Sequence, residues 1–100
     1  MNAAQKIQCN NRSWFVMSFN VTDGDNFNYA TDDYLTLQSQ TIDLAASTFH
    51  EGTNVWPIVS AVLGITQPAT DHVSFAMNGK TAVYEITGAA RNFSMKFVGI

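Results

Sequence analysis

The segment His72–Gly88, which reads HVSFAMNGKTAVYEITG, constrains the fold of this chain more than any other segment. Apolar and polar residues alternate on both sides of Asn78-Gly79, as they do in half-buried strands. Asn-Gly is the pair that a two-residue type I′ turn favours, because both turn positions need φ > 0. The sequence therefore predicts a β-hairpin, and its register places these residues on the core face: Val73, Phe75, Met77, Ala82, Tyr84 and Ile86.

The same register defines the outer face of the predicted hairpin. His72 lies opposite Glu85, which predicts a modest cross-strand pair. Between that pair and the turn, the outer residues are small or uncharged: Ser74, Ala76, Thr81 and Val83. A flat face of this kind does not strongly repel another sheet, so we expect a subunit contact there and a homo-oligomer.

Other alternating segments extend the pattern along the chain. Ser13–Thr22 and Arg91–Val98 alternate over their whole length, and Val55–Ile65 is apolar on both faces, as in a central strand. Pro57 argues for an edge, a bulge or a strand start at that point. Lys6–Cys9 and Gln40–Leu44 predict further short strands. We expect an all-β, antiparallel β-sandwich, Greek-key or jelly-roll-like, of about six to eight short strands, in a single domain spanning 1–100.

Charge and composition argue against several classes of partner. Charged residues make up 13 % of the chain, the net charge is −3, and the five Lys and Arg are scattered. A nucleic-acid partner leaves a basic footprint and an anionic membrane attracts a polybasic cluster, so we expect no nucleic acid and only a weak case for a membrane. Cys9 is the single cysteine, which precludes an intramolecular disulfide. No signal peptide is visible, so we expect a cytoplasmic protein, or one secreted without such a signal.

The loop Asp23–Asp33 is the best candidate for a metal site. It carries half of the acidic residues of the chain, namely Asp23, Asp25, Asp32 and Asp33. Ca²⁺ prefers hard oxygen ligands, so these four carboxylates are the candidate ligands of a possible calcium ion. The spacing does not follow the EF-hand pattern, because Phe27 stands at the fifth position. The alternative is a solvated loop whose Asp and Asn side chains form turns.

The same loop is a candidate ligand-binding site. Aromatic rings stack on the apolar face of a sugar while carboxylate and amide groups bind its hydroxyls. The candidate contacts are Asp23, Asp25, Asn28, Tyr29 and Asp32. An enzyme is not expected, because Cys9, His50 and His72 show no local motif of a nucleophile and its base.

The sequence thus favours a non-enzymatic binding protein, a small lectin-like β-sandwich that binds carbohydrate through its acidic and aromatic loop. One alternative is a self-assembling β protein, favoured by the low charge and by the two apolar faces of Val55–Ile65. Another is a membrane- or lipid-binding protein that uses Trp14, Trp56 and Phe27 as interfacial anchors.

Overall fold

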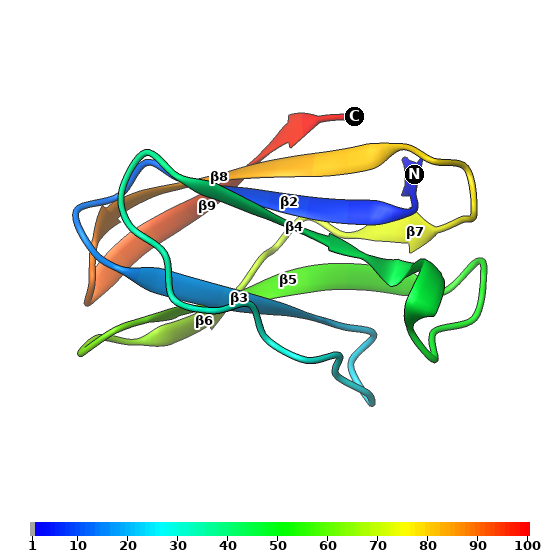
Figure 1. Ribbon diagram of the computed structural model, residues 1–100, viewed down its shortest axis with the longest axis horizontal. Helices are drawn as coiled ribbons and strands as arrows, with labels where there is room; N and C mark the ends of the chain where they lie inside the picture. The colour runs from blue at the N-terminus through cyan, green and yellow to red at the C-terminus, as the bar shows by residue number, and fades with distance from the viewer. Residues whose placement is uncertain (1) are drawn as a thin grey trace.

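The computed structural model describes residues 2–100 and shows two β-sheets packed face to face (Figure 1). The first sheet has the order β1-β7-β5-β3, with β6 paired to β5, and the second has the order β4-β2-β8-β9. The strands are β1 (Ala3–Ala4), β2 (Lys6–Asn11), β3 (Met17–Thr22), β4 (Ser39–Asp43), β5 (Asn54–Ala61), β6 (Thr66–Pro68), β7 (Val73–Phe75), β8 (Thr81–Ala89) and β9 (Asn92–Gly99). Within residues 2–100 the one helical element is the 3-10 turn η1 (Leu44–Ala46), and no helix there has the length and apolar character needed to cross a bilayer.

The prediction of an all-β, sandwich-like fold holds, but the expectation of purely antiparallel sheets is wrong. β1 runs parallel to β7, and β2 runs parallel to β8. The N-terminal segment therefore follows the later segment in the same direction and changes sheets at the same point. At that point the backbone N–H of Gln5 donates to the carbonyl of Lys80 at 2.9 Å, and Gly79 N–H donates to Gln5 Oε1 at 3.0 Å.

The predicted hairpin is also wrong, because its two strands lie in different sheets. β7 pairs with β1 and β5, whereas β8 pairs with β2 and β9. Gly79 has φ 73° but Asn78 is not among the residues with positive φ, so the type I′ geometry is absent from this turn. Asn78 instead donates from Nδ2 to the carbonyl of Ala3 at 3.0 Å and accepts at Oδ1 from the Lys80 N–H at 2.9 Å. The N-terminal strands take the pairing positions that a hairpin would have used.

The core face predicted for this segment is nevertheless largely right. Val73 and Phe75 are buried in one sheet, and Ala82, Tyr84 and Ile86 are buried in the other. The two strands line opposite walls of one core, so side-chain alternation identified the inward residues although the pairing differed. Met77 is the exception: it lies in the corner between the sheets and is 55 % exposed.

The outer face predicted for the hairpin does not exist as one surface. Ser74 lies in β7 with Ala76 just beyond it, whereas Thr81 and Val83 belong to the other sheet, so no single flat contact face forms. His72 and Glu85 are not cross-strand partners: Glu85 lies opposite Lys96 of β9, and the ring of His72 stacks on Trp56.

β5 is a central strand, as predicted, with β3 on one side and β6 and β7 on the other. It ends at Ala61 rather than at Ile65, because residues 62–65 turn at the surface. Pro57 lies inside it rather than at an edge or strand start. The β7 pairing ends at Val55 and the β6 pairing starts at Ile58, so Pro57 occupies the gap between these two neighbours. Its carbonyl accepts from Ala69 N–H at 2.9 Å on that side. The N–H that proline lacks would point to the same side, so no bond to β3 is lost.

Element boundaries differ from the sequence prediction where side chains bind the backbone. β2 continues through Asn11, two residues beyond the predicted strand Lys6–Cys9, and β3 starts at Met17 rather than at Ser13. Residues 12–16 carry the chain from one sheet to the other. In β9 every second residue faces the core: Phe93 is buried, and Met95 and Phe97 pack against it.

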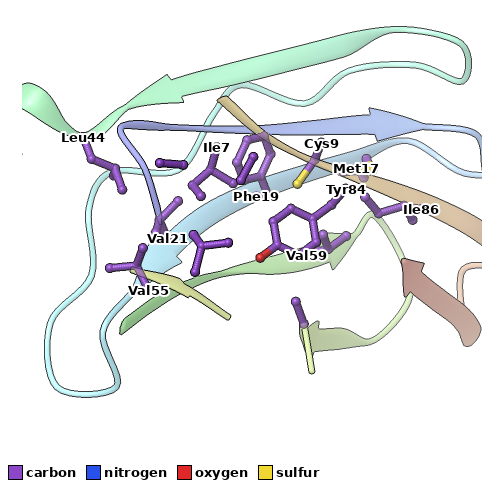
Figure 2. Packing of buried hydrophobic residues seen from close by; sticks show 14 of the residues in the cluster. Ile7, Cys9, Met17, Phe19, Val21, Leu44, Val55, Val59, Tyr84 and Ile86 are labelled. Atoms are coloured by element: carbon purple, nitrogen blue, oxygen red, sulfur yellow. The ribbon is translucent and has the colours of Figure 1, made fainter. Parts of the chain in front are cut away.

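The core between the sheets is apolar and includes the single cysteine (Figure 2). Cys9 is fully buried, and this burial raises the pKa of its thiol. Two buried tyrosines keep their hydroxyls hydrogen-bonded: Tyr34 donates to the carbonyl of Cys9 and Tyr84 to that of Asp71, each at 2.8 Å. Burial also raises the pKa of both phenols.

Candidate functional site

The acidic end of the loop Asp23–Asp33 is a self-contained turn. Asp23 Oδ1 accepts from the backbone N–H groups of Asn26 at 2.7 Å and of Asp25 at 2.9 Å. These bonds, that from Asn26 foremost, lower the pKa of the Asp23 carboxyl below its ordinary value. The carboxylate therefore shapes its own loop, as in the alternative interpretation of the sequence.

The middle of the loop runs back along β3. Asn28 Oδ1 accepts from the Val21 N–H at 2.5 Å, and the Asn28 N–H donates to the Val21 carbonyl at 3.1 Å. Thr31 exchanges a similar pair of bonds with Phe19. The loop thus covers the edge of β3, and the acceptor oxygen of Asn28 is committed to that role.

The structure does not bring the four predicted calcium ligands together. Within residues 2–100 no group of three or more His, Cys, Asp or Glu is placed to hold a metal ion. Asp23 follows Thr22 at one end of β3, whereas Asp33 precedes Tyr34, which pairs with Met17 at the other end. The two ends are about 16 Å apart at roughly 3.3 Å per residue.

The aromatic part of the loop lines a cavity of about 380 Å³. This volume lies within the range of ordinary small-ligand sites. One wall comes from the loop, and the other comes from the segment that follows η1. The lining residues are Phe27, Asn28, Tyr29, Ala46, Ser47, Thr48 and Phe49. Phe49 is buried, whereas Phe27 is 62 % and Tyr29 is 96 % exposed, so the rings of the loop wall are open to a ligand.

The second wall is held by a short capped turn. Asp43 Oδ1 accepts from the Ala45 N–H at 2.9 Å at the start of η1, and this bond is the main cause of a lowered Asp43 pKa. After the turn, Ser47 Oγ donates to the Leu44 carbonyl at 2.6 Å and accepts from the Phe49 N–H at 3.3 Å. Leu44 is fully buried and anchors this wall in the core.

The structure divides the predicted ligand contacts into two groups. Asn28 and Tyr29 line the cavity, whereas Asp23, Asp25 and Asp32 do not. Sequence reasoning missed the residues of the second wall, because Ser47–Thr53 reads as a plain connection. The adjacent Ser47 and Thr48 beside an aromatic residue were the only local signal, and only the tertiary contact with the loop gives it meaning.

Cys9, His50 and His72 lie in three different surroundings. Cys9 is inaccessible in the core. The ring of His72 stacks on Trp56, with centroids 3.8 Å apart and planes 9° apart, while His50 is exposed in the loop before β5. The edge of Trp56 also lies beneath Gly24, at 3.3 Å from the position a Cβ would take. These contacts make Trp56 and His72 part of the packing under the loop.

Comparison of the chain with protein-family models, curated proteins and solved structures found no match.

Proposed function

We propose that this protein is a non-enzymatic, lectin-like module that binds a small carbohydrate in the cavity between residues 27–29 and 46–49. The observation that carries the proposal is the pairing of exposed rings with short polar side chains in one concavity. Rings offer a stacking surface to the C–H face of a sugar, and hydroxyl and amide groups match its hydroxyls.

The chemistry of the lining narrows the ligand class. None of the residues that line the cavity is Asp, Glu, Lys or Arg. A charged ligand group would have no opposite charge to meet there, so a neutral sugar fits better than an acidic or amino sugar. The hydroxyls of Ser47 and Thr48 and the Nδ2 donors of Asn28 supply the polar contacts, and Tyr29 supplies the stacking ring.

The test is a glycan array followed by calorimetric titration of the neutral sugars that bind, with and without Ca²⁺. Tyr29→Ala is expected to weaken binding about tenfold, because the stacking of a sugar on an aromatic ring contributes about 1–1.5 kcal/mol. Trp14→Ala is the matched control, since Trp14 is a comparably exposed aromatic outside the cavity. Absence of binding to any glycan under both conditions contradicts the proposal.

Self-association is the second candidate function, and the edge strand β9 favours it. β9 is eight residues long, ends the second sheet, and continues into an exposed apolar end with Val98 at 53 % and Ile100 at 50 % exposure. A long edge strand is a template for pairing with a second copy, although Lys96 on the exposed face opposes this. Light scattering at high concentration distinguishes a dimer or larger assembly from a monomer. Val98→Lys is expected to dissociate an assembly that pairs through β9.

A further inference from the structure

The end of the sandwich remote from the cavity exposes an unusual concentration of apolar side chains. Four connections meet at this end, on the left in Figure 1: residues 12–16, 35–38, 62–65 and 89–91. Three side chains protrude most, with Leu63 at 89 %, Trp14 at 87 % and Leu37 at 76 % exposure. We call this group the apolar tip, and it comprises Trp14, Leu35, Leu37, Val62, Leu63 and Ile65.

The connections of the apolar tip are tied together by backbone hydrogen bonds. Leu37 N–H donates to the Asn11 carbonyl at 2.6 Å, and Val62 N–H donates to the Val16 carbonyl at 2.9 Å. Trp14 N–H donates to the Gly88 carbonyl at 3.0 Å, and Ile65 N–H donates to the Ala90 carbonyl at 2.9 Å. The side chains therefore project from one joined platform rather than from independent loops.

Two of the protruding leucines hold an unfavourable backbone conformation. Leu37 has φ 70° and Leu63 has φ 59°, and within residues 2–100 they are the only non-glycine residues with positive φ. Each is the third residue of a four-residue turn, closed by Gln38 N–H to Leu35 and by Gly64 N–H to Ala61. Glycine or asparagine is the usual occupant of such a position, because a Cβ there costs about 1 kcal/mol or more. A bulky apolar side chain at both turns gains nothing from the core, which points to a role outside it.

Trp14 is held out from the platform by a buried polar network. Asn11, with no exposed surface, donates from Nδ2 to the carbonyls of Phe15 at 2.9 Å and Tyr34 at 3.2 Å. Its Oδ1 accepts from both the N–H and the hydroxyl of Ser13. Ser13 and Phe15 are buried on either side of Trp14, so the backbone directs the indole outward.

Two basic side chains accompany the apolar tip, because Arg12 and Arg91 are both exposed on its connections. The opposite end carries four of the eight acidic residues and only two basic ones: Asp23, Asp25, Asp43 and Glu51, with Lys6 and Lys80. Asp32 and Asp33 lie in the loop beside β3. Arg12 and Arg91 can therefore contact an anionic surface that the tip approaches, whereas the opposite end bears an excess of acidic groups.

We propose that the apolar tip docks on the surface of a lipid bilayer that contains anionic phospholipids, with Trp14, Leu37 and Leu63 entering the interfacial region. Tryptophan favours that region, and isolated leucines on turns enter acyl chains without any matching pocket. Arg12 and Arg91 would lie at the level of the headgroup phosphates. A second protein molecule would need a complementary pocket for three separate projections.

The test is co-sedimentation with vesicles of phosphatidylcholine alone and of phosphatidylcholine with phosphatidylserine. The double variant Leu37→Asn, Leu63→Asn removes both side chains at positions where asparagine tolerates positive φ, so its folding is not at risk. We expect binding to the mixed vesicles to fall about tenfold for each leucine. Met77→Asn is the matched control, because Met77 is exposed at the other end of the molecule, and it should bind like the wild type.

Two further readouts separate the lipid from other occupants. In a Trp56→Phe background, Trp14 is the only tryptophan, and its emission should shift to the blue on mixed vesicles. The double variant Arg12→Gln, Arg91→Gln should bind the mixed vesicles no better than phosphatidylcholine alone. Wild-type protein that stays in the supernatant overturns the proposal, as does vesicle binding that the leucine substitutions leave intact. A dimer by light scattering that the same substitutions dissociate would assign the tip to a second copy of the chain.

Discussion

The two ends of the sandwich place different residues at turn positions with positive φ. Near the cavity, the turns that require positive φ use glycine, as at Gly24 with φ 99° and Gly52 with φ 87°. At the apolar tip, the corresponding turn positions hold Leu37 and Leu63. Glycine adopts this conformation without steric cost, whereas leucine does not. Within residues 2–100, non-glycine residues with positive φ therefore occur only at the apolar tip, where each displays a large apolar side chain.

The two ends also differ in how their polar groups are used. At the cavity end, Asp23 and Asp43 bind nearby backbone N–H groups and shape exposed turns. At the tip, the Asn11 side chain is completely buried and binds two segments of the chain at once, residues 13–15 and Tyr34. The exposed turns can adjust to a ligand, whereas the tip is preorganised by its buried anchor.

The largest expected effect is on the anchor of the tip. Asn11→Ala removes every hydrogen bond of this buried side chain and leaves the Ser13 N–H without its partner, so it should lower the free energy of unfolding by about 3 kcal/mol, as measured by urea denaturation. Asn92→Ala, at an exposed asparagine near the same end, is the control and should change stability by less than about 0.5 kcal/mol. A loss below about 1 kcal/mol for Asn11→Ala would show that the tip does not depend on this network.

The next effect compares two glycines that are needed for different reasons. A Cβ on Gly64 would lie 2.2 Å from the carbonyl oxygen of Ala90, whereas one on Gly52 would meet nothing within 4 Å. Gly64→Ala should therefore cost about 2–3 kcal/mol through backbone displacement. Gly52→Ala should cost only about 1 kcal/mol, from its positive φ. Equal losses in thermal denaturation would contradict the close approach of the two turns at the tip.

The strained leucines should give an effect of the opposite sign. Leu37→Asn and Leu63→Asn should each raise the free energy of unfolding by about 0.5–1 kcal/mol, because asparagine tolerates the left-handed conformation better. Leu35→Asn is the control: it is 57 % exposed in the same turn but without positive φ, and it should bring no gain. Destabilisation by both leucine substitutions, measured by calorimetry, would mean that these side chains contribute to folding after all.

The smallest effect concerns pH and should distinguish the two ends. The folded-state pKa values of Asp23 and Asp43 are lowered, so their contribution is complete above the ordinary carboxyl pKa and is lost as pH falls through the lowered values. Both groups are exposed, so the change in stability is small. Carboxyl chemical shifts followed by NMR should show both midpoints below the range of free aspartate. Asp23→Asn retains the Oδ1 acceptor and should remove that part of the acid dependence.

The sequence predicts side-chain orientation well and strand partnership poorly. Tyr84 and Phe75 were placed in the core correctly, because alternation along one strand is local information. Their strands were paired wrongly, because the competing partners β1 and β2 lie far away in the chain. Asn78-Gly79 has the composition of a hairpin turn, yet the Asn78 side chain donates to the carbonyl of Ala3.

The candidate sites show the same limit. The carboxylates of the acidic loop looked like ligands, but the Asp23 side chain is occupied by its own turn. The positive φ of Leu37 has no signature in the sequence, because the residue is not glycine. Trp14 falls within the predicted strand Ser13–Thr22, whereas it lies in the connection before β3, between buried neighbours. Tertiary hydrogen bonds decide each case, and a single sequence does not display them.

The parallel pairing of β2 with β8 has a consequence for synthesis of the chain. β2 lies inside the second sheet, between β4 and β8, so residues 6–11 wait for residues 81–86, which are synthesised later. Until β8 leaves the ribosome, β2, which carries Ile7 and Cys9, lacks its neighbouring strand on one side. Pairing over such a separation in sequence is slow to form. A nascent chain arrested before Thr81 should therefore remain sensitive to protease and should expose a reactive thiol, which the released protein conceals.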